Sequence, residues 1–202
     1  MTDIFTGWTE CRAVWNKGAR NVVEQIHDIE RCLPFKLLGF DCDNGSEFLN
    51  HHLVRYFSDR RVPVCMTRSR PYRKNDNAHV EQKNWTHPRH LLGYDRIDNS
   101  SIVPAINDLY ANEWALLQNH FYPSVKLLSK TRNGAKYIKI HDKPTTPYQR
   151  VIAADKITRN NKKSLIALHN TLNPFILKKS IETKLKAIFE QISVSSNLKR
   201  RV

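Results

Sequence analysis

The chain has 202 residues and carries 33 Lys and Arg against 19 Asp and Glu, a formal net charge of +14 at pH 7. This length suffices for one domain with a hydrophobic core and a smaller addition, and an apolar fraction of 40% excludes a disordered chain. No apolar run approaches the roughly 20 residues that cross a bilayer, so we expect no membrane partner. The excess of cations favours nucleic acid as the partner, and a generally basic surface is the alternative.

The cysteines and the first residues bear on where the protein works. No two cysteines form a C-x-x-C pair, and all lie in the first third of the chain: Cys11, Cys32, Cys42 and Cys65. The N-terminus lacks the charged and apolar regions of a signal peptide. We therefore expect reduced thiols in a cytoplasmic protein.

Strands and helices are predicted to alternate through the first third of the chain. Residues 3–15 have the alternation of a hairpin, and residues 18–32 that of an amphipathic helix. The apolar run 35–40 predicts a buried strand, a helix capped by Ser46 follows it, and residues 62–66 predict a second strand. This order is typical of an α/β layer architecture with parallel strand pairing.

Three regions are predicted along the chain. Residues 1–122 hold the α/β core, which ends in a helix at 102–121, and residues 123–150 form a Pro- and Lys-rich connecting segment that is mostly irregular. Residues 151–202 form a basic helical C-terminal region, in which Asn173-Pro174 begins the last helix. That helix carries one apolar stripe, which predicts a packing face: Leu177, Ile181, Leu185, Ile188, Phe189 and Ile192.

Carboxylates follow the first predicted buried strand. Asp41 and Asp43 come at its carboxyl end, the edge at which open α/β sheets bind ligands, and their spacing puts both on one face. Glu81 lies among cations in the first turns of a helix predicted from about Asn77, where a site can hold metal and phosphate together. The alternative is that the aspartates form a turn before an Asn-Gly pair and that Glu81 is a solvated residue at a helix start.

A basic loop between these acids combines cations with an aromatic side chain. Arg68, Arg70, Arg73 and Lys74 are placed to grip phosphates, and Tyr72 to stack on an unpaired base. We therefore expect these five residues to bind DNA. The alternative is a solvated basic loop.

Two motifs that flank this loop complete the pattern: Asp43-Asn44-Gly45-Ser46-Glu47-Phe48 and His79-Val80-Glu81-Gln82-Lys83-Asn84-Trp85. Together with stretches that begin at Arg68, Gly93, Lys126 and Thr146, they resemble the integrase catalytic core of insertion-sequence transposases. These enzymes belong to the DDE class, which includes retroviral integrases. The likeness covers nearly the whole chain.

The resemblance implies an RNase H-like fold, a mixed sheet flanked by helices, with Mg²⁺ (or Mn²⁺) ions held by Asp, Asp and Glu. Asp43 matches the second acid and Glu81 the third. The ions would activate water or a 3′-hydroxyl for attack on a phosphodiester, and Lys83, with arginines of the basic loop, would hold DNA near them. The implied function is metal-dependent strand transfer in the transposition, integration and recombination of a mobile element.

The family's first acid has no match in this chain. It lies on the first strand of the family's sheet, whereas Asp3 matches the second strand. We therefore expect an N-terminally truncated core that does not transfer strands alone. Its expected partners are DNA and either a second copy of the chain or an intact transposase. The alternative is a non-enzymatic, basic DNA-binding remnant.

Overall fold

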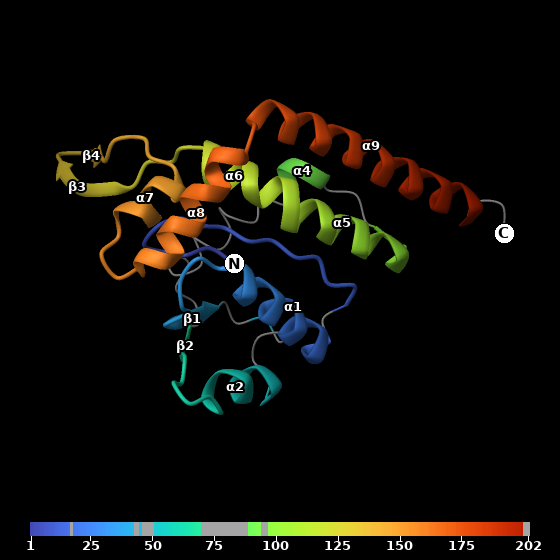
Figure 1. Ribbon diagram of the computed structural model, residues 1–202, viewed down its shortest axis with the longest axis horizontal. Coiled ribbons are helices and arrows are strands. Elements are labelled where there is room, and N and C mark those ends of the chain that lie inside the picture. The colour runs from blue at the N-terminus through green and yellow to red at the C-terminus, as the bar shows by residue number, and fades with distance from the viewer. Residues whose placement is uncertain (17, 43–44, 46–50, 70–88, 94–96, 200–202) are drawn as a thin grey trace.

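A computed structural model describes residues 1–16, 18–42, 45, 51–69, 89–93 and 97–199. The elements in chain order are α1 (Ala19–Cys32), β1 (Gly39–Cys42), α2 (His51–Ser58), β2 (Cys65–Arg68), α4 (His90–Leu92), η2 (Ser100–Ile102), α5 (Val103–Leu109), η3 (Tyr110–Trp114), α6 (Ala115–Phe121), β3 (Leu127–Asn133), β4 (Lys136–His141), α7 (Pro147–Ala153), α8 (Arg159–Thr171) and α9 (Pro174–Lys199). The described residues thus form a mixed α/β structure of helices and two small sheets: β1–β2 lies beside α1 and α2, and β3–β4 lies at one end of the molecule (Figure 1). None of the described helices is both long and apolar enough to cross a membrane.

The β1–β2 pair forms a layer with α1 and α2. The strands run parallel, with Gly39 opposite Cys65 and Cys42 opposite Arg68, which confirms the predicted pairing. Alternate residues of β1 are buried because one side of the strand packs against both helices. The resulting core contains Val22, Ile26, Phe40, Cys42, Leu53, Phe57 and Val64.

Both strands begin later than predicted. β1 starts at Gly39 rather than at 35, and β2 starts at Cys65 rather than at 62. Pro63 has no amide hydrogen to donate to a ladder, and Leu38 is exposed although it is apolar. Each strand therefore begins where its residues pair with the other strand and become buried, and not where the apolar run begins.

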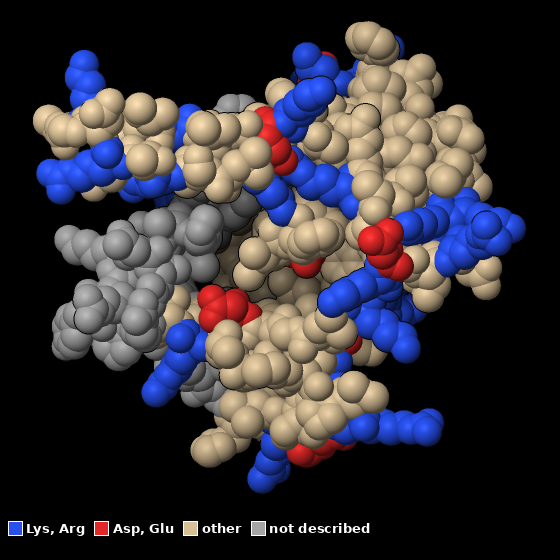
Figure 2. Space-filling view, turned by 90° about the vertical axis from the view of Figure 1, so that its left-hand side faces the viewer, with Lys and Arg blue, Asp and Glu red and all other residues tan. Residues whose placement is uncertain are grey.

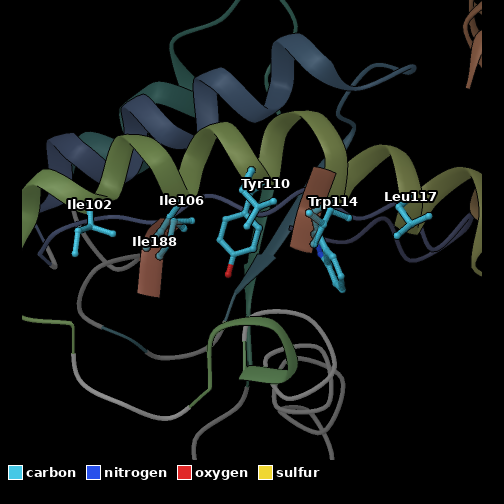
Figure 3. Packing of buried hydrophobic residues seen from close by; sticks show 8 residues of the cluster. Ile102, Ile106, Tyr110, Trp114, Leu117 and Ile188 are labelled. Atoms are coloured by element: carbon cyan, nitrogen blue, oxygen red, sulfur yellow. The ribbon is translucent and has the colours of Figure 1, made fainter. Parts of the chain in front are cut away.

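The helix predicted at 102–121 is confirmed as a continuous rod. It runs through η2, α5, the π-helical turn η3 and α6. Side chains at intervals of three or four residues point to one side of the rod, where α9 packs: Ile102, Ile106, Tyr110, Trp114 and Leu117 (Figure 3). This seam is the hydrophobic core of the helical part.

α9 presents its apolar stripe to the rod, as the sequence predicts. Ile181 and Ile188 are buried in the seam, and Leu177 and Leu185 are partly buried beside them. Phe189 is exposed, which corrects its assignment to the packing face. Consecutive residues point about 100° apart around a helix, so burial of Ile188 turns Phe189 toward solvent.

Side-chain caps define the starts of the C-terminal helices. Thr146 and Gln149 form a capping box at α7, and the side chains of Thr158 and Asn173 accept amide hydrogens at the starts of α8 and α9. The two helices predicted after residue 151 are confirmed as α8 and α9. α7 precedes them and begins at Pro147.

The prediction that residues 123–150 are mostly irregular is wrong. Residues 127–141 form the antiparallel β3–β4 hairpin, closed by the two-residue loop Gly134-Ala135. Gly134 has a φ of 61°, a conformation that glycine adopts readily at the first position of such a loop. Lysines and threonines interrupt the apolar alternation on both strands, so neither strand shows the pattern of a half-buried one.

The N-terminal residues form a turn closed by one bridge, in place of the predicted hairpin at 3–15. Thr2 pairs with Thr9, and the Asp3 carboxylate accepts hydrogen bonds from the amide and hydroxyl of Thr6 at 2.6 and 2.5 Å. Residues 10–14 form no strand.

Two asparagines on the rod supply the backbone partners that a neighbouring strand would otherwise supply. Asn119 is fully buried; it accepts from the amide of Thr9 at 2.8 Å and donates to the carbonyl of Thr9 at 2.9 Å. Asn107 makes the same pair of bonds to Ala13, at 2.6 and 3.1 Å. The N-terminal segment is therefore fixed to the rod by side-chain amides, which satisfy its backbone polar groups.

Asn119→Leu tests this fixation. The substitution keeps a side chain branched at Cγ but leaves the amide and carbonyl of Thr9 buried without partners, so we expect a loss of about 2–4 kcal/mol in the free energy of unfolding. Asn112→Leu, at an exposed position of the same rod, is the matched control and should change it by less than about 0.5 kcal/mol. Equal effects in urea denaturation would contradict the assignment.

The seam between the rod and α9 offers a second matched pair. Ile188 is 2% exposed and Ile176, in the same helix, is 68% exposed. We expect Ile188→Ala to lower the free energy of unfolding by about 2–5 kcal/mol, because it leaves a cavity, whereas Ile176→Ala should cost under about 1 kcal/mol. Chemical denaturation of both variants measures the difference, and similar losses would show that α9 does not pack through Ile188.

Candidate functional site

The carboxyl ends of β1 and β2 meet at one edge of the parallel pair, the edge at which α/β sheets place ligand sites. Asp41 lies opposite Thr67, and Cys42 lies opposite Arg68. The Thr67 hydroxyl donates to Oδ1 of Asp41 at 2.7 Å. Asp41 and Arg68 are both exposed, so this edge presents a carboxylate and a guanidinium to solvent.

Packing against the hydrophobic core holds β1, the strand that carries Asp41, in place. Phe40 and Cys42 are buried, and the Phe40 ring lies 4.9 Å from the Phe57 ring of α2. Beyond the last paired residues, the amide of Ser69 donates to the carbonyl of Cys42 at 2.9 Å. The backbone that leads into residue 43 is therefore fixed by core packing and by a ladder bond.

Most of the predicted site residues lie outside the described residues: Asp43, Arg70, Tyr72, Arg73, Lys74, Glu81 and Lys83. Their roles stay predictions. Arg68 is the predicted DNA-binding residue that the structure places, at the end of β2 and near the acid-bearing end of β1. Within the described residues, no three His, Cys, Asp or Glu side chains form a group that could hold a metal ion. The two predicted metal ligands, Asp43 and Glu81, lie outside these residues.

An ion pair fixes α2 to α1 on the helical side of the sheet. Arg60 forms a forked pair with Glu30, with N–O distances of 2.7 and 2.8 Å, and the Tyr56 hydroxyl donates to Glu30 at 2.7 Å. Hydrogen bonding from Arg60 lowers the pKa of Glu30, while burial and the Glu30 bond raise the pKa of Tyr56 to about 12. Because these charges satisfy one another, we interpret this cluster as structural.

A second charged cluster carries no signal in the sequence pattern. Glu10 and Arg12 are buried on the side of the N-terminal segment that the alternation assigned to solvent. Trp8 Nε1 donates to Glu10 at 3.0 Å, and Arg12 Nε donates to Asp28 of α1 at 2.6 Å. Burial raises the pKa of Glu10. The sequence pattern does not indicate that these residues are buried. The polar side of an alternating segment is buried only when another element covers it.

A buried aromatic stack lies where α6, α7 and α8 meet the N-terminal segment. The Nδ1 atoms of His120 and His169 are 3.0 Å apart, so one ring donates to the other. Tyr148 stacks on His169 at 4.0 Å, and Trp8 meets His120 edge-on at 5.6 Å. Nε2 of His120 is buried and has no hydrogen-bond partner among the described residues. Burial and the nearby His169 lower the pKa of His120 to about 4.

Comparison with curated proteins gives a relative that matches most of this chain. Over 150 residues, 74% of the chain, the protein is 41% identical to the uncharacterized protein y4rM of Sinorhizobium fredii (strain NBRC 101917 / NGR234). The chain spans 42% of that relative's length. No family model matches the chain, and no solved structure matches it. We therefore infer the function from the chemistry of the candidate site.

The His120 stack predicts a pH dependence of stability. His120 is neutral in the folded protein, and in the unfolded chain it is protonated below its ordinary pKa of 6.5. The contribution of neutral His120 to the free energy of unfolding is therefore fully present above about pH 6.5 and is lost as the pH falls to about 4. The total loss is about 3 kcal/mol.

The measurement is the free energy of unfolding at several pH values in this window. His120→Phe should be less stable at neutral pH, because it loses the bond to His169, and should show a shallower decline toward pH 4. The control His141→Phe changes an exposed histidine and should keep the steep decline. An unchanged slope in His120→Phe would refute the assignment.

Proposed function

We propose that this chain is part of the catalytic core of a DDE-type transposase, of the class that includes retroviral integrases, with an RNase H-like fold. The observation that carries the proposal is the parallel β1–β2 pair, whose carboxyl ends bring Asp41, two residues before Asp43, to the same edge as Arg68. Strand transfer requires carboxylates that hold metal next to cations that hold phosphate, and this edge combines both kinds of side chain.

The order of elements gives further support. An N-terminal turn closed by an antiparallel bridge is followed by α1 and then by the unit β1–α2–β2. This succession agrees with the positions at which the resemblance puts the second strand, the strand before the second acid and the strand that follows it. Because the chain spans 42% of the length of its curated relative, the activity of a complete protein is part of the proposal.

In this proposal Asp43 and Glu81 bind Mg²⁺ or Mn²⁺, and Arg68, Arg70, Arg73 and Lys83 bind DNA phosphates. A bound divalent cation would activate an attacking water or hydroxyl and stabilise charge on the phosphate. None of the 202 residues matches the family's first acid. We therefore propose that strand transfer requires a first strand that supplies this acid, either from an upstream segment or from an intact transposase.

A second candidate is a non-enzymatic DNA-binding protein, which the net charge of +14 favours. Phosphate neutralisation releases counterions, so binding to duplex DNA should weaken steeply with salt in both candidates. Metal binding separates them, because only the first candidate uses Asp43 and Glu81 as ligands.

Calorimetric titration of the purified chain with Mn²⁺ or Mg²⁺ tests the metal site. We expect weak binding that Asp43→Asn or Glu81→Gln reduces by about tenfold or more, since each change removes a full negative charge beside the cation. Asp155→Asn and Glu190→Gln, at exposed positions of the helical region, are the matched controls and should bind as the parent does.

Activity gives the complementary readout. We expect the purified chain alone to perform no metal-dependent strand transfer. Transfer by this chain alone that Glu81→Gln abolishes would refute the need for a further acid, whereas identical metal binding by all variants would favour the non-enzymatic candidate.

A further inference from the structure

The β3–β4 hairpin projects from the body of the protein, at the end of the molecule away from the tip of α9 (Figure 1). Thirteen residues form the two strands, and nearly all of them are exposed. Figure 2 views the molecule from this side, and blue Lys and Arg side chains are spread over the face while red Asp and Glu side chains are few. The hairpin thus adds little to the described core and presents most of its surface to solvent.

Every charged side chain of the hairpin is cationic. Between Leu127 and His141 it carries four Lys and Arg and no Asp or Glu. The register places Lys130 opposite Lys139 and Arg132 opposite Tyr137, so these four side chains share one face. The Lys130 ammonium lies 4.4 Å from the centre of the Tyr137 ring. Like charges opposite each other destabilise a strand pair, and the hairpin contains no acid to offset this repulsion.

The other face has a different character. Ser129 lies opposite Ile140 and Thr131 lies opposite Ile138, so uncharged side chains occupy the middle of this face. Of the four cations, only Lys136 is on this side, at the loop end. Charge is therefore concentrated on the face of Lys130, Arg132 and Lys139, which gives the ribbon a defined side for a polyanion.

The base of the hairpin is tied to the body. Arg150 of α7 binds the carboxylate of Asp142 at 3.2 Å and donates to the carbonyl of Ser124 at 2.6 Å. Asp142 also accepts from the amide of Lys126, and Ser124 pairs with Thr145 across the chain. These contacts fix the direction in which the hairpin projects from the rest of the protein. Less conformational entropy is therefore lost when the exposed end of the hairpin binds a partner.

We propose that the cationic face of the β3–β4 hairpin binds duplex DNA, with the ribbon in the major groove and Lys130, Arg132 and Lys139 on the phosphates. A two-stranded ribbon fits the major groove of B-form DNA, about 12 Å wide, whereas the deep and narrow major groove of A-form RNA does not admit it. The inference rests on the proposed function in that the partner is DNA. It adds a second DNA-binding surface, which is distant in the sequence from the predicted DNA-binding residues between Arg68 and Lys83.

The test compares two triple variants of equal charge. One carries Lys130→Gln, Arg132→Gln and Lys139→Gln on the hairpin; the other carries Lys163→Gln, Lys178→Gln and Lys186→Gln at exposed positions of α8 and α9. Affinity for a short duplex DNA is measured by fluorescence anisotropy over a range of salt concentrations. A Lys130→Arg, Lys139→Arg double variant keeps the charge and shows whether the altered hairpin still folds and binds.

We expect the hairpin triple variant to bind duplex DNA at least about tenfold more weakly than the control triple, with a salt slope smaller by about 0.9 for each phosphate that the hairpin no longer neutralises. The arginine double variant should bind as the parent does. The parent should prefer duplex DNA to duplex RNA of the same sequence and to vesicles that contain anionic lipid, because the ribbon's shape selects the groove.

The outcomes separate this inference from the proposed function. If the parent binds DNA and the two triple variants bind equally well, the hairpin proposal is overturned and the proposed function stands. If the parent does not bind duplex DNA at low salt, both fail. Equal or tighter binding of duplex RNA or of anionic vesicles, abolished in the hairpin triple variant, would also overturn DNA as the hairpin's partner.

Discussion

The structure depends on how residues 8–14 are held between its layers. Trp8 packs in the cluster around α7 and α8, Cys11 and Ala13 pack against the rod, and Val14 packs against the β1–β2 core. All three described hydrophobic clusters therefore meet along seven residues that form almost no strand. Such a segment is stable only if its backbone groups are hydrogen-bonded, and Asn107 and Asn119 provide bonds at its two ends.

The polar side chains of this segment connect it to the sheet layer in the same way. Arg12 binds Asp28 of α1, and Glu10 is held by Trp8 and Arg12 within the interior. Buried charges of this kind are costly unless each has partners, so they fix one arrangement of the segment more than they add stability. This arrangement sets α1, and through it β1, relative to the helical rod. The geometry of the candidate sheet edge therefore depends on side chains remote from it.

Elements with one strong period were predictable. The helix at 18–32, the rod and α9 each bury a single stripe, and their spacing in the sequence identified the stripe because helical geometry repeats regardless of context. The parallel pairing of β1 and β2 followed from the alternation of strands and helices. The sequence did not reveal the hairpin, because exposed strands on both faces need no apolar alternation. It also did not reveal the burial of Glu10, because a strand pattern cannot report which element covers its polar side.

Local chemistry therefore determined from sequence alone where α1, the rod, α8 and α9 lie, which side of α9 packs, that β1 ends in a run containing acids, and that the chain is strongly cationic. Only the tertiary structure decided that Asn119, 110 residues after Thr9, would serve as its backbone partner, and that Lys130, Arg132 and Lys139 would gather on one face of a projecting ribbon. The physical reason is that side-chain period is a property of neighbours in the chain. Burial, pairing and the placement of charge depend on residues that folding brings together from distant positions.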